Sequence, residues 1–251
     1  MCFTLFDFTL SKNFKDKMTE QKYPRTKQAL VYNFVYDEEQ VKRFARLIDS
    51  ENTYQLLCIV SRPKYHKGSL PNRHMSPRTF AKYSPERYLE QVRKYEQSVG
   101  YYTEDGAAFP DDSFVIYAST NGLNGKSAAK KFVGDILDAA FETSADYIFE
   151  HLNGKLNSAL MAVKANVKLI TIDIDAKDEL AEVKDFLAEH KVTPAATIET
   201  HGGYHVLIKV GDLAPLKGAL HKKFAQKHTI KDMMCAVPGT LQAGFPVRFV
   251  D

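Results

Sequence analysis

Residues 167–210 read VKLITIDIDAKDELAEVKDFLAEHKVTPAATIETHGGYHVLIKV, and this stretch decides the fold. Its first nine residues and the run at 204–210 have the apolar pattern of strands, and residues 178–190 have the spacing of a helix. ATIET (196–200) predicts another strand, and the HGG that follows predicts a tight turn. The predicted order is therefore strand, helix, strand, strand.

The residues toward the C-terminus extend this pattern. PLKGALHKKFAQKH (215–228) predicts a helix, and PVRFV (246–250) predicts a final strand. The complete order is β-α-β-β-α-β, the split βαβ arrangement in which two helices cover one face of a four-stranded antiparallel sheet. We therefore expect an α+β protein whose residues 161–251 form an RRM-like part.

The residues before this part, 28–160, predict an N-terminal α/β part, and residues 1–27 predict a loosely held arm without a clear period. The predicted strands of the N-terminal part are ALVYNFVY (29–36), TYQLLCIVS (53–61) and SFVIYAST (113–120). Its predicted helices cover residues 37–48, 85–99 and 126–141, and Ser84 followed by Pro85 marks the start of the second of them.

The composition is typical of a soluble globular protein, with 251 residues, 44% hydrophobic and 26% charged. The formal net charge of +3 is too small to indicate a partner by itself. No run approaches the roughly 18 apolar residues of a membrane span, and the N-terminus lacks the order of a secretory signal, so we expect a cytoplasmic protein. The three cysteines, Cys2, Cys58 and Cys235, form no CxxC pattern and predict neither a zinc site nor a disulfide framework.

Two acidic side chains, Asp173 and Asp175, end an otherwise apolar strand. Strand side chains alternate between faces, so Ile172 and Ile174 are expected against the helices and both aspartates on the open face. The two Cα atoms would lie about 6–7 Å apart, close enough for the carboxylates to share a divalent metal. The alternative is that Asp175 or Asp178 simply caps the helix that follows.

A histidine and a lysine are expected beside this pair. The first and third strands are adjacent in the split βαβ arrangement, which puts His205 and Lys209 next to Asp173 and Asp175. Such a pocket suits a triphosphate chelated by a metal. The alternative is a surface hairpin with a structural histidine, and His201, at the hairpin corner, is expected to be exposed.

A third carboxylate precedes the last predicted strand. Asp232, flanked by Ile230 and Met233, would complete a site for two metals. Arg248 is the only basic residue after Lys231, and it is expected either to contact phosphate or to cover the sheet.

These three pieces, in this order, resemble the archaeo-eukaryotic primase superfamily, the primase-polymerases of viral, plasmid and cellular replication. Asp173-Ile174-Asp175 is similar to their acid-x-acid motif, and Gly203-Tyr204-His205 is similar to their small-x-His motif. Ile230-Lys231-Asp232 resembles their hydrophobic-acid motif with a lysine inserted, and PGT at 238–240 resembles the segment after it. The motifs cover residues 167–250, about a third of the chain.

The resemblance implies a primase-polymerase-like core and a template-dependent DNA primase or polymerase. Asp173, Asp175 and Asp232 would be catalytic and would hold Mg²⁺ or Mn²⁺. One ion would activate the attacking 3′-oxygen and the other would neutralise the leaving pyrophosphate. The implied partners are a single-stranded DNA template, nucleoside triphosphates and a replicative helicase, with no membrane. The nucleotide-binding residues would be His205, Lys209, Gly203 and Arg248.

A basic segment lies between Arg62 and Lys94, where nine basic residues stand against two acids, a local charge of +7, with aromatic residues interleaved. Proteins commonly hold a nucleic-acid strand by Lys and Arg on its phosphates and by aromatic stacking. We expect the template here, and a solvated loop and helix face is the alternative. The nucleic-acid-binding candidates are Arg62, Lys64, Lys67, Arg73, Arg78, Lys82 and Lys126.

The stretch TNGLNGKS (120–127) invites comparison with the phosphate loop GxxxxGK[ST], because it lies between a predicted strand and a predicted helix. Thr120 replaces the first glycine of that motif. We therefore favour a helix N-terminus whose Lys126 touches phosphate over an ATPase loop.

Two other functions stay open. One is a catalytically silent, nucleic-acid-binding replication initiator that uses only the basic segment. The other is a metal-dependent phosphodiesterase that uses the same acids to cleave a strand.

Overall fold

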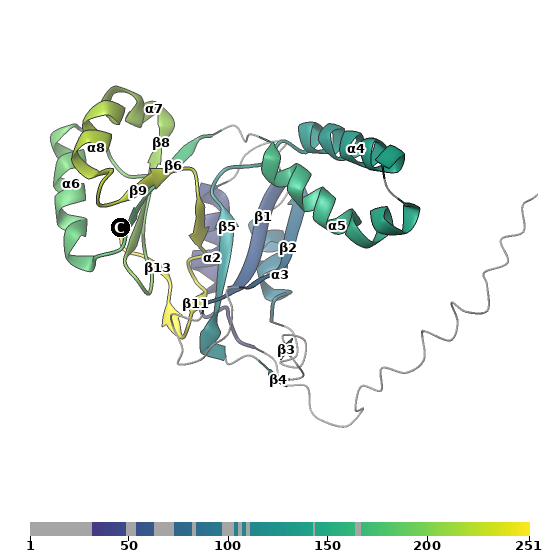
Figure 1. The fold of residues 1–251 in the computed structure, drawn as a ribbon. Helices are drawn as coiled ribbons and strands as arrows, with labels where there is room; N and C mark the ends of the chain where they lie inside the picture. Colours follow the sequence, from purple (N-terminus) through teal and green to yellow (C-terminus); the bar gives the residue numbers. More distant parts are fainter. Residues whose placement is uncertain are drawn as a thin grey trace, which may run out of the picture.

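Two antiparallel sheets, one of four strands and one of five, form the frame of this mixed α and β protein (Figure 1). The predicted α+β class is therefore confirmed in general terms. The predicted arm at 1–27 lies outside the described residues. The computed structural model describes residues 32–48, 54–62, 73–81, 84–96, 103–104, 107–108, 111–142, 144–163 and 167–251.

The first sheet comes mainly from the N-terminal part of the chain. Its strands are β1 (Tyr54–Ser61), β2 (Arg73–Ala81), β5 (Phe114–Ser119) and β10 (Met234–Ala236). They lie in the order β10-β5-β1-β2, and each neighbouring pair is antiparallel. Strand β1 is buried over nearly its whole length, as its apolar run predicts. Strand β10 belongs to the C-terminal part, so it ties the two parts of the chain together.

One face of this sheet is covered by two helices, α2 (Glu38–Leu47) and α3 (Pro85–Arg93). Both begin where the sequence predicts. The Asp37 side chain accepts a hydrogen bond from the backbone amide of Gln40, and the Ser84 side chain accepts one from that of Arg87. These caps satisfy amide groups that the first helical turn leaves without a partner.

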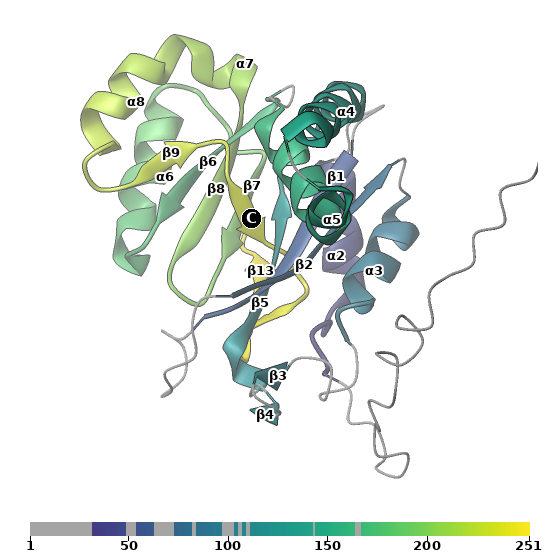
Figure 2. The same cartoon turned by 45° about the vertical axis from the view of Figure 1, so that its right-hand side comes forward.

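A helical hairpin stands on the other face of the first sheet (Figure 2). It consists of α4 (Gly125–Glu142) and α5 (Ala145–Ala162). Only Ala128 and Ala139 of α4 are buried, so most of this helix projects into solvent. A small apolar cluster joins the hairpin to the sheet through Leu56, Leu123, Ala128 and Leu160.

The second sheet and its helices come from the C-terminal part. In chain order the elements are β6 (Leu169–Ile174), α6 (Leu180–Glu189), β7 (Ala196–Glu199), β8 (Tyr204–Lys209), α7 (Val210–Leu213), α8 (Lys217–Phe224), β9 (Thr229–Lys231) and β13 (Arg248–Phe249). The strands lie in the order β13-β7-β8-β6-β9, so β6 and β8 are adjacent, as predicted.

The final strand predicted at 246–250 joins this sheet as β13, but it is not the strand that follows the second helix, because β9 takes that place in the order. Strand β9 pairs with β6 at one edge, and β13 pairs with β7 at the opposite edge. Strand β9 pairs with β6 because it directly follows α8 along the chain and so reaches the free edge of β6 first. The chain then crosses to the first sheet as β10 before it returns as β13.

The remaining elements are short. They are β3 (Thr103–Glu104), β4 (Ala107–Ala108), β11 (Leu241–Gln242), β12 (Phe245–Pro246) and the 3-10 turns Asp111–Ser113, Lys177–Glu179 and Ala214–Leu216. No helix within the described residues has both the length and the apolar character needed to cross a bilayer.

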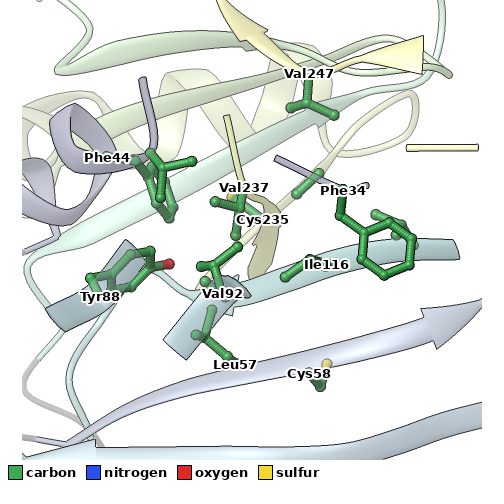
Figure 3. Packing of buried hydrophobic residues seen from close by; sticks show 14 of the residues in the cluster. Phe34, Phe44, Leu57, Cys58, Tyr88, Val92, Ile116, Cys235, Val237 and Val247 are labelled. Carbon is green, nitrogen blue, oxygen red and sulfur yellow. The ribbon is translucent and has the colours of Figure 1, made fainter. Parts of the chain in front are cut away.

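Alternate residues of β6 face opposite sides of the second sheet. Ile172 and Ile174 pack with α6 and α8, as predicted. Leu169 points the other way and belongs to the larger core that the two sheets share. Figure 3 shows Cys235 and Val237, from β10 and the residues after it, inside that core. The face of β6 that carries Asp173 is therefore the face toward the first sheet.

Candidate functional site

A cavity of about 350 Å³ is lined by residues of both sheets. The second sheet contributes Asp173 from β6, His205 from β8 and Lys231 from β9. The cavity thus combines one carboxylate and one imidazole with basic side chains in a partly apolar setting. The other lining residues are Cys58, Val60, Arg62, Tyr117, Met233 and Met234.

Asp173 and His205 form the centre of this cavity. The register of β6 and β8 places them directly opposite each other. Their side chains are 27% and 8% exposed, and His205 Nε2 lies 3.4 Å from Asp173 Oδ1. The predicted proximity of these two residues is confirmed, because directly opposed residues in an antiparallel pair share one face.

The surroundings of His205 favour its protonated form. Burial lowers the pKa of the imidazole, but Cys235 and Asp173 beside it raise the pKa, and the net shift is upward, to about 10. An unperturbed histidine is mostly neutral at pH 7. His205 therefore adds a positive charge to the cavity, whereas burial raises the pKa of the Cys58 thiol to about 11 and keeps it neutral.

Gly203 fixes the turn that presents this histidine. A Cβ atom at this position would lie 1.8 Å from the carbonyl oxygen of Ile174, so only glycine fits. The turn is closed by Thr200, whose Oγ1 accepts a hydrogen bond from the Gly203 amide over 3.2 Å. The backbone contact holds the end of β6, where the acidic residues lie, against the start of β8. The predicted nucleotide contact of Gly203 stays a prediction.

Arg62 brings a guanidinium group to the cavity from the end of β1. Its Nη2 donates a hydrogen bond to the Tyr117 hydroxyl over 2.7 Å, and its Cζ lies 5.2 Å from the centre of that ring. Arg62 thus reaches the same cavity as Lys231 from the opposite sheet. The anchored guanidinium of Arg62 and the exposed ammonium group of Lys231 in one cavity suit a ligand with several negative charges.

The other predicted template-binding residues are placed only in part. Arg73 and Arg78 lie on β2, opposite Ser61 and Leu57 of β1. The remaining candidates of the basic segment, Lys64, Lys67 and Lys82, lie outside the described residues.

The structure separates Asp232 from the other two aspartates. Its Oδ1 accepts a hydrogen bond from Asn121 Nδ2 over 2.8 Å, and it lines a neighbouring cavity of about 360 Å³. Asp175 follows the last residue of β6 and is exposed. Among the described residues, no three His, Cys, Asp or Glu side chains are grouped to hold a metal ion. The expectation that all three aspartates lie together in one metal site is therefore corrected.

The strand register explains this separation. Lys231 lies opposite Thr171, so Asp232 comes after the last pair of β9 and β6, in line with Ile170 rather than with Asp173. Three residues of strand separate Ile170 from Asp173, a distance of about 10 Å. The sequence predicts the segment that carries Asp232, but it does not determine the register in which β9 pairs with β6.

Asn121 is a residue that the sequence did not single out. Its Oδ1 accepts hydrogen bonds from the backbone amides of Lys168 and Leu169, over 2.8 and 2.9 Å, and its Nδ2 donates to the Leu169 carbonyl over 2.7 Å as well as to Asp232. This buried amide joins the end of β5 to the start of β6. In the sequence, Asn121 is part of the stretch that invites comparison with the phosphate loop, and that comparison gives it no structural role.

The loop that resembles a phosphate loop is organised by its own side chains. Asn124 Oδ1 accepts a hydrogen bond from the Ser127 amide over 3.0 Å and so caps α4. A Cβ atom at Gly125 would lie 1.9 Å from the Tyr54 ring, so the glycine serves close packing. Lys126 is exposed at the start of α4, and its contact with phosphate stays a prediction.

Two predicted nucleotide-binding residues lie away from the cavity. Lys209 is opposite Leu169, four residues from Asp173 along the sheet, which is about 13 Å. Arg248 lies at the far edge of the second sheet, where its Nε and Nη2 each donate to Glu199 Oε2 over 2.8 Å. The expectation that Lys209 adjoins the aspartates is therefore wrong, because it is on the correct face but at the other end of the strand.

The two acids at the end of β6 fit one divalent metal better than two. Mg²⁺ is commonly held by one or two carboxylates together with phosphate oxygens of a substrate. Asp173 offers a partly exposed carboxylate, and Asp175 follows at the strand end. The predicted set with Asp232 does not fit, because that carboxylate lines a different cavity.

Comparisons with protein-family models, with curated proteins and with solved structures find no match for this chain.

Proposed function

We propose that the chain is a template-dependent DNA primase or polymerase that binds a nucleoside triphosphate in the cavity of Asp173 and His205. One observation carries the proposal: Asp173 and His205 face each other in a cavity that Arg62 and Lys231 also line. An acid beside three cationic groups suits a triphosphate that carries a divalent metal.

The residues of the cavity have different proposed roles, which follow from their chemistry. Arg62, Lys231 and the protonated His205 bind and orient the phosphates, because each offers N–H donors and a positive charge. Asp173, with Asp175 nearby, would hold Mg²⁺ or Mn²⁺, and the ion would supply charge neutralisation at the transferring phosphate. The interaction between Asp173 and His205 also keeps the imidazole turned toward the cavity.

The order of the elements supports the same proposal. Strands β6, β8 and β9, which carry the three sequence motifs, are neighbours in the sheet, as in the split βαβ arrangement that the resemblance implies. The proposal differs from the sequence-based expectation in its residues. It leaves Asp232 out of the metal ligands and Lys209 and Arg248 out of the nucleotide-binding residues, and it adds Arg62 and Lys231 to the latter.

A single-stranded DNA template is the proposed second substrate. Arg62 belongs to the cavity and also begins the basic segment, so a template held by that segment would pass beside the bound nucleotide. The proposal includes a replicative helicase as a partner and the cytoplasm as the compartment.

A silent replication initiator is the second candidate, because the three predicted acids are not grouped in the described part of the chain. An initiator would bind DNA equally well with and without divalent metal. It would also incorporate no nucleotide.

The test compares Asp173→Asn with Asp185→Asn, an exposed aspartate of α6 on the helix side of the same sheet. With Mn²⁺ or Mg²⁺ and a primed or unprimed single strand, Asp173→Asn should lower nucleotide incorporation at least about a hundredfold. Asp185→Asn should keep the wild-type rate.

Unchanged incorporation by Asp173→Asn would reject the proposed site. A wild-type protein that binds DNA without incorporating nucleotides would favour the initiator. Shortening of a labelled strand by the wild type would instead identify a phosphodiesterase.

A further inference from the structure

A second cavity, of about 640 Å³, lies beside the edge strand β9 on the helix side of the second sheet. Figure 1 shows α7 and α8 on that side of the sheet, away from the first sheet. The apolar part of the lining consists of Val167, Ile170, Val210, Leu213, Ala214 and Ile230. Small-molecule sites in proteins commonly have volumes of about 300–1,000 Å³ and mostly apolar walls. This cavity therefore has the size and the lining of such a site.

The cavity exists because β9 is shorter than β6. The last pair of these strands joins Lys231 to Thr171, so Ile170 has no neighbour on the β9 side. Asn121 binds the backbone amide and carbonyl of Leu169 at this point, and the chain after β9 leaves for the first sheet as β10. Ile170 is therefore only partly buried, and its side chain forms an apolar wall that no further strand covers.

Three basic side chains, and no acidic side chain of a described residue, complete the lining. Lys217 and His221 are four residues apart on α8, so they lie on one side of that helix, and Lys231 comes from β9. All three are exposed, and none forms an ion pair within the described part of the chain. Lys223, further along α8, is instead paired with Glu182. The positive charge at this cavity is therefore left for a ligand to neutralise.

We infer that this cavity binds an aliphatic anion, a small molecule with a hydrocarbon chain and a carboxylate or phosphate head. The chain would lie against Ile170, Leu213 and Ile230, and the head would accept hydrogen bonds from Lys217 and Lys231. A nucleobase matches the cavity less well, because proteins commonly hold bases by stacking on aromatic rings. No phenylalanine or tyrosine is among the described residues that line the cavity.

The two parts of such a ligand make separate contributions that an experiment can measure. Each methylene group that leaves water for an apolar cavity tightens binding about fourfold. The charged head adds hydrogen bonds to ammonium groups, which are stronger than those between neutral partners. Affinity should therefore rise with chain length and fall when the head carries no charge.

The test titrates the full chain with decanoate by calorimetry, without nucleotide or divalent metal. Decanoate should bind, and octanoate and hexanoate should each bind about tenfold more weakly than the acid two carbons longer. The uncharged 1-octanol should bind at least about tenfold more weakly than octanoate. Decyl phosphate is titrated beside decanoate, and the tighter of the two identifies the head group.

Two variants locate the binding. Lys217→Gln should weaken decanoate binding about tenfold and leave 1-octanol binding unchanged. Lys222→Gln, at an exposed lysine of the same helix that does not line the cavity, is the matched control and should bind decanoate like the wild type. Ala214→Phe places a ring in the cavity and should weaken both ligands.

Three results would overturn the inference. They are the absence of binding by both decanoate and decyl phosphate, equal affinities for octanoate and 1-octanol, and a Lys217→Gln protein that binds decanoate like the wild type. Displacement of decanoate by adenosine monophosphate at a similar affinity would also overturn it, because the cavity would then be a nucleotide site. Lys217 does not line the cavity of Asp173 and His205, so the inference and the proposed function can fail separately.

Discussion

Asn121 holds Asp232 away from Asp173 by a hydrogen bond of 2.8 Å from its side-chain amide to the Asp232 carboxylate. The same amide binds the backbone of Lys168 and Leu169 at the start of β6. One buried side chain therefore sets both the position of the central strand and the direction of an acid that the sequence assigns to a metal site.

Replacing Asn121 should destabilise the fold. Asn121→Ala removes the acceptor of the buried Leu169 amide and of the partly buried Lys168 amide, so we expect the free energy of unfolding to fall by about 3 kcal/mol. Urea denaturation measures this change. Asn124→Ala, which removes only the exposed cap of α4, should cost about 1 kcal/mol. Equal losses in the two variants would contradict the structural role of Asn121.

Two glycines should respond in opposite directions to the same substitution. Gly203→Ala places a Cβ atom against the Ile174 carbonyl and should destabilise the protein by about 2–3 kcal/mol. Gly154, inside α5, has nothing within 4 Å of an added Cβ atom, so Gly154→Ala should stabilise by up to about 1 kcal/mol. Thermal unfolding checks both values, and a tolerated Gly203→Ala would show that the turn is looser than described.

The raised pKa of His205 should be measurable in an NMR titration and in the pH dependence of the free energy of unfolding. Because the pKa is raised, to about 10, the stabilisation from the protonated ring is fully present below the unfolded pKa of about 6.5 and is lost as the pH rises toward 10. His205→Gln should remove this slope from the unfolding free energy. Asp173→Asn should lower the pKa of His205 in an NMR titration, and an unchanged value would reject their interaction.

Glu199 should make the protein sensitive to acid. Hydrogen bonds from Lys177 and Arg248 lower the pKa of the Glu199 carboxyl, although burial opposes the shift. The stabilisation is therefore present above the unfolded pKa of about 4.3 and is lost as the pH falls through the lowered value. Glu199→Gln should cost about 1 kcal/mol at neutral pH and flatten the acid side of the stability profile. Glu189→Gln, at an exposed glutamate of α6, should leave that profile unchanged.

The two basic residues of the cavity should matter for nucleotide binding, whereas Lys209 should not. Arg62→Ala and Lys231→Ala each remove a cation from the cavity and should weaken nucleotide binding about tenfold, measured by calorimetry with metal present. Lys209→Ala removes a cation about four strand residues away and should bind like the wild type. Weaker binding by Lys209→Ala alone would move the nucleotide to the other end of the sheet.

Local features of the sequence predicted much of the fold. The caps at Asp37 and Ser84 gave the helix starts, and the alternation around Ile172 and Ile174 gave the buried face of β6. These features depend on residues close together in the chain. Asn121 was missed because its partners are far away in the sequence, up to Asp232, and nothing in the neighbouring residues indicates them.

The amino-acid pattern alone determined which segments become strands and which side of β6 carries Asp173, because alternation along a strand is a local property. It also determined that His205 lies beside that acid, once β6 and β8 are neighbours. Only the tertiary structure decided where Asp232, Lys209 and Arg248 lie. Their positions depend on the register of β9, the length of β8 and the edge that β13 joins, and these follow from contacts between distant parts of the chain.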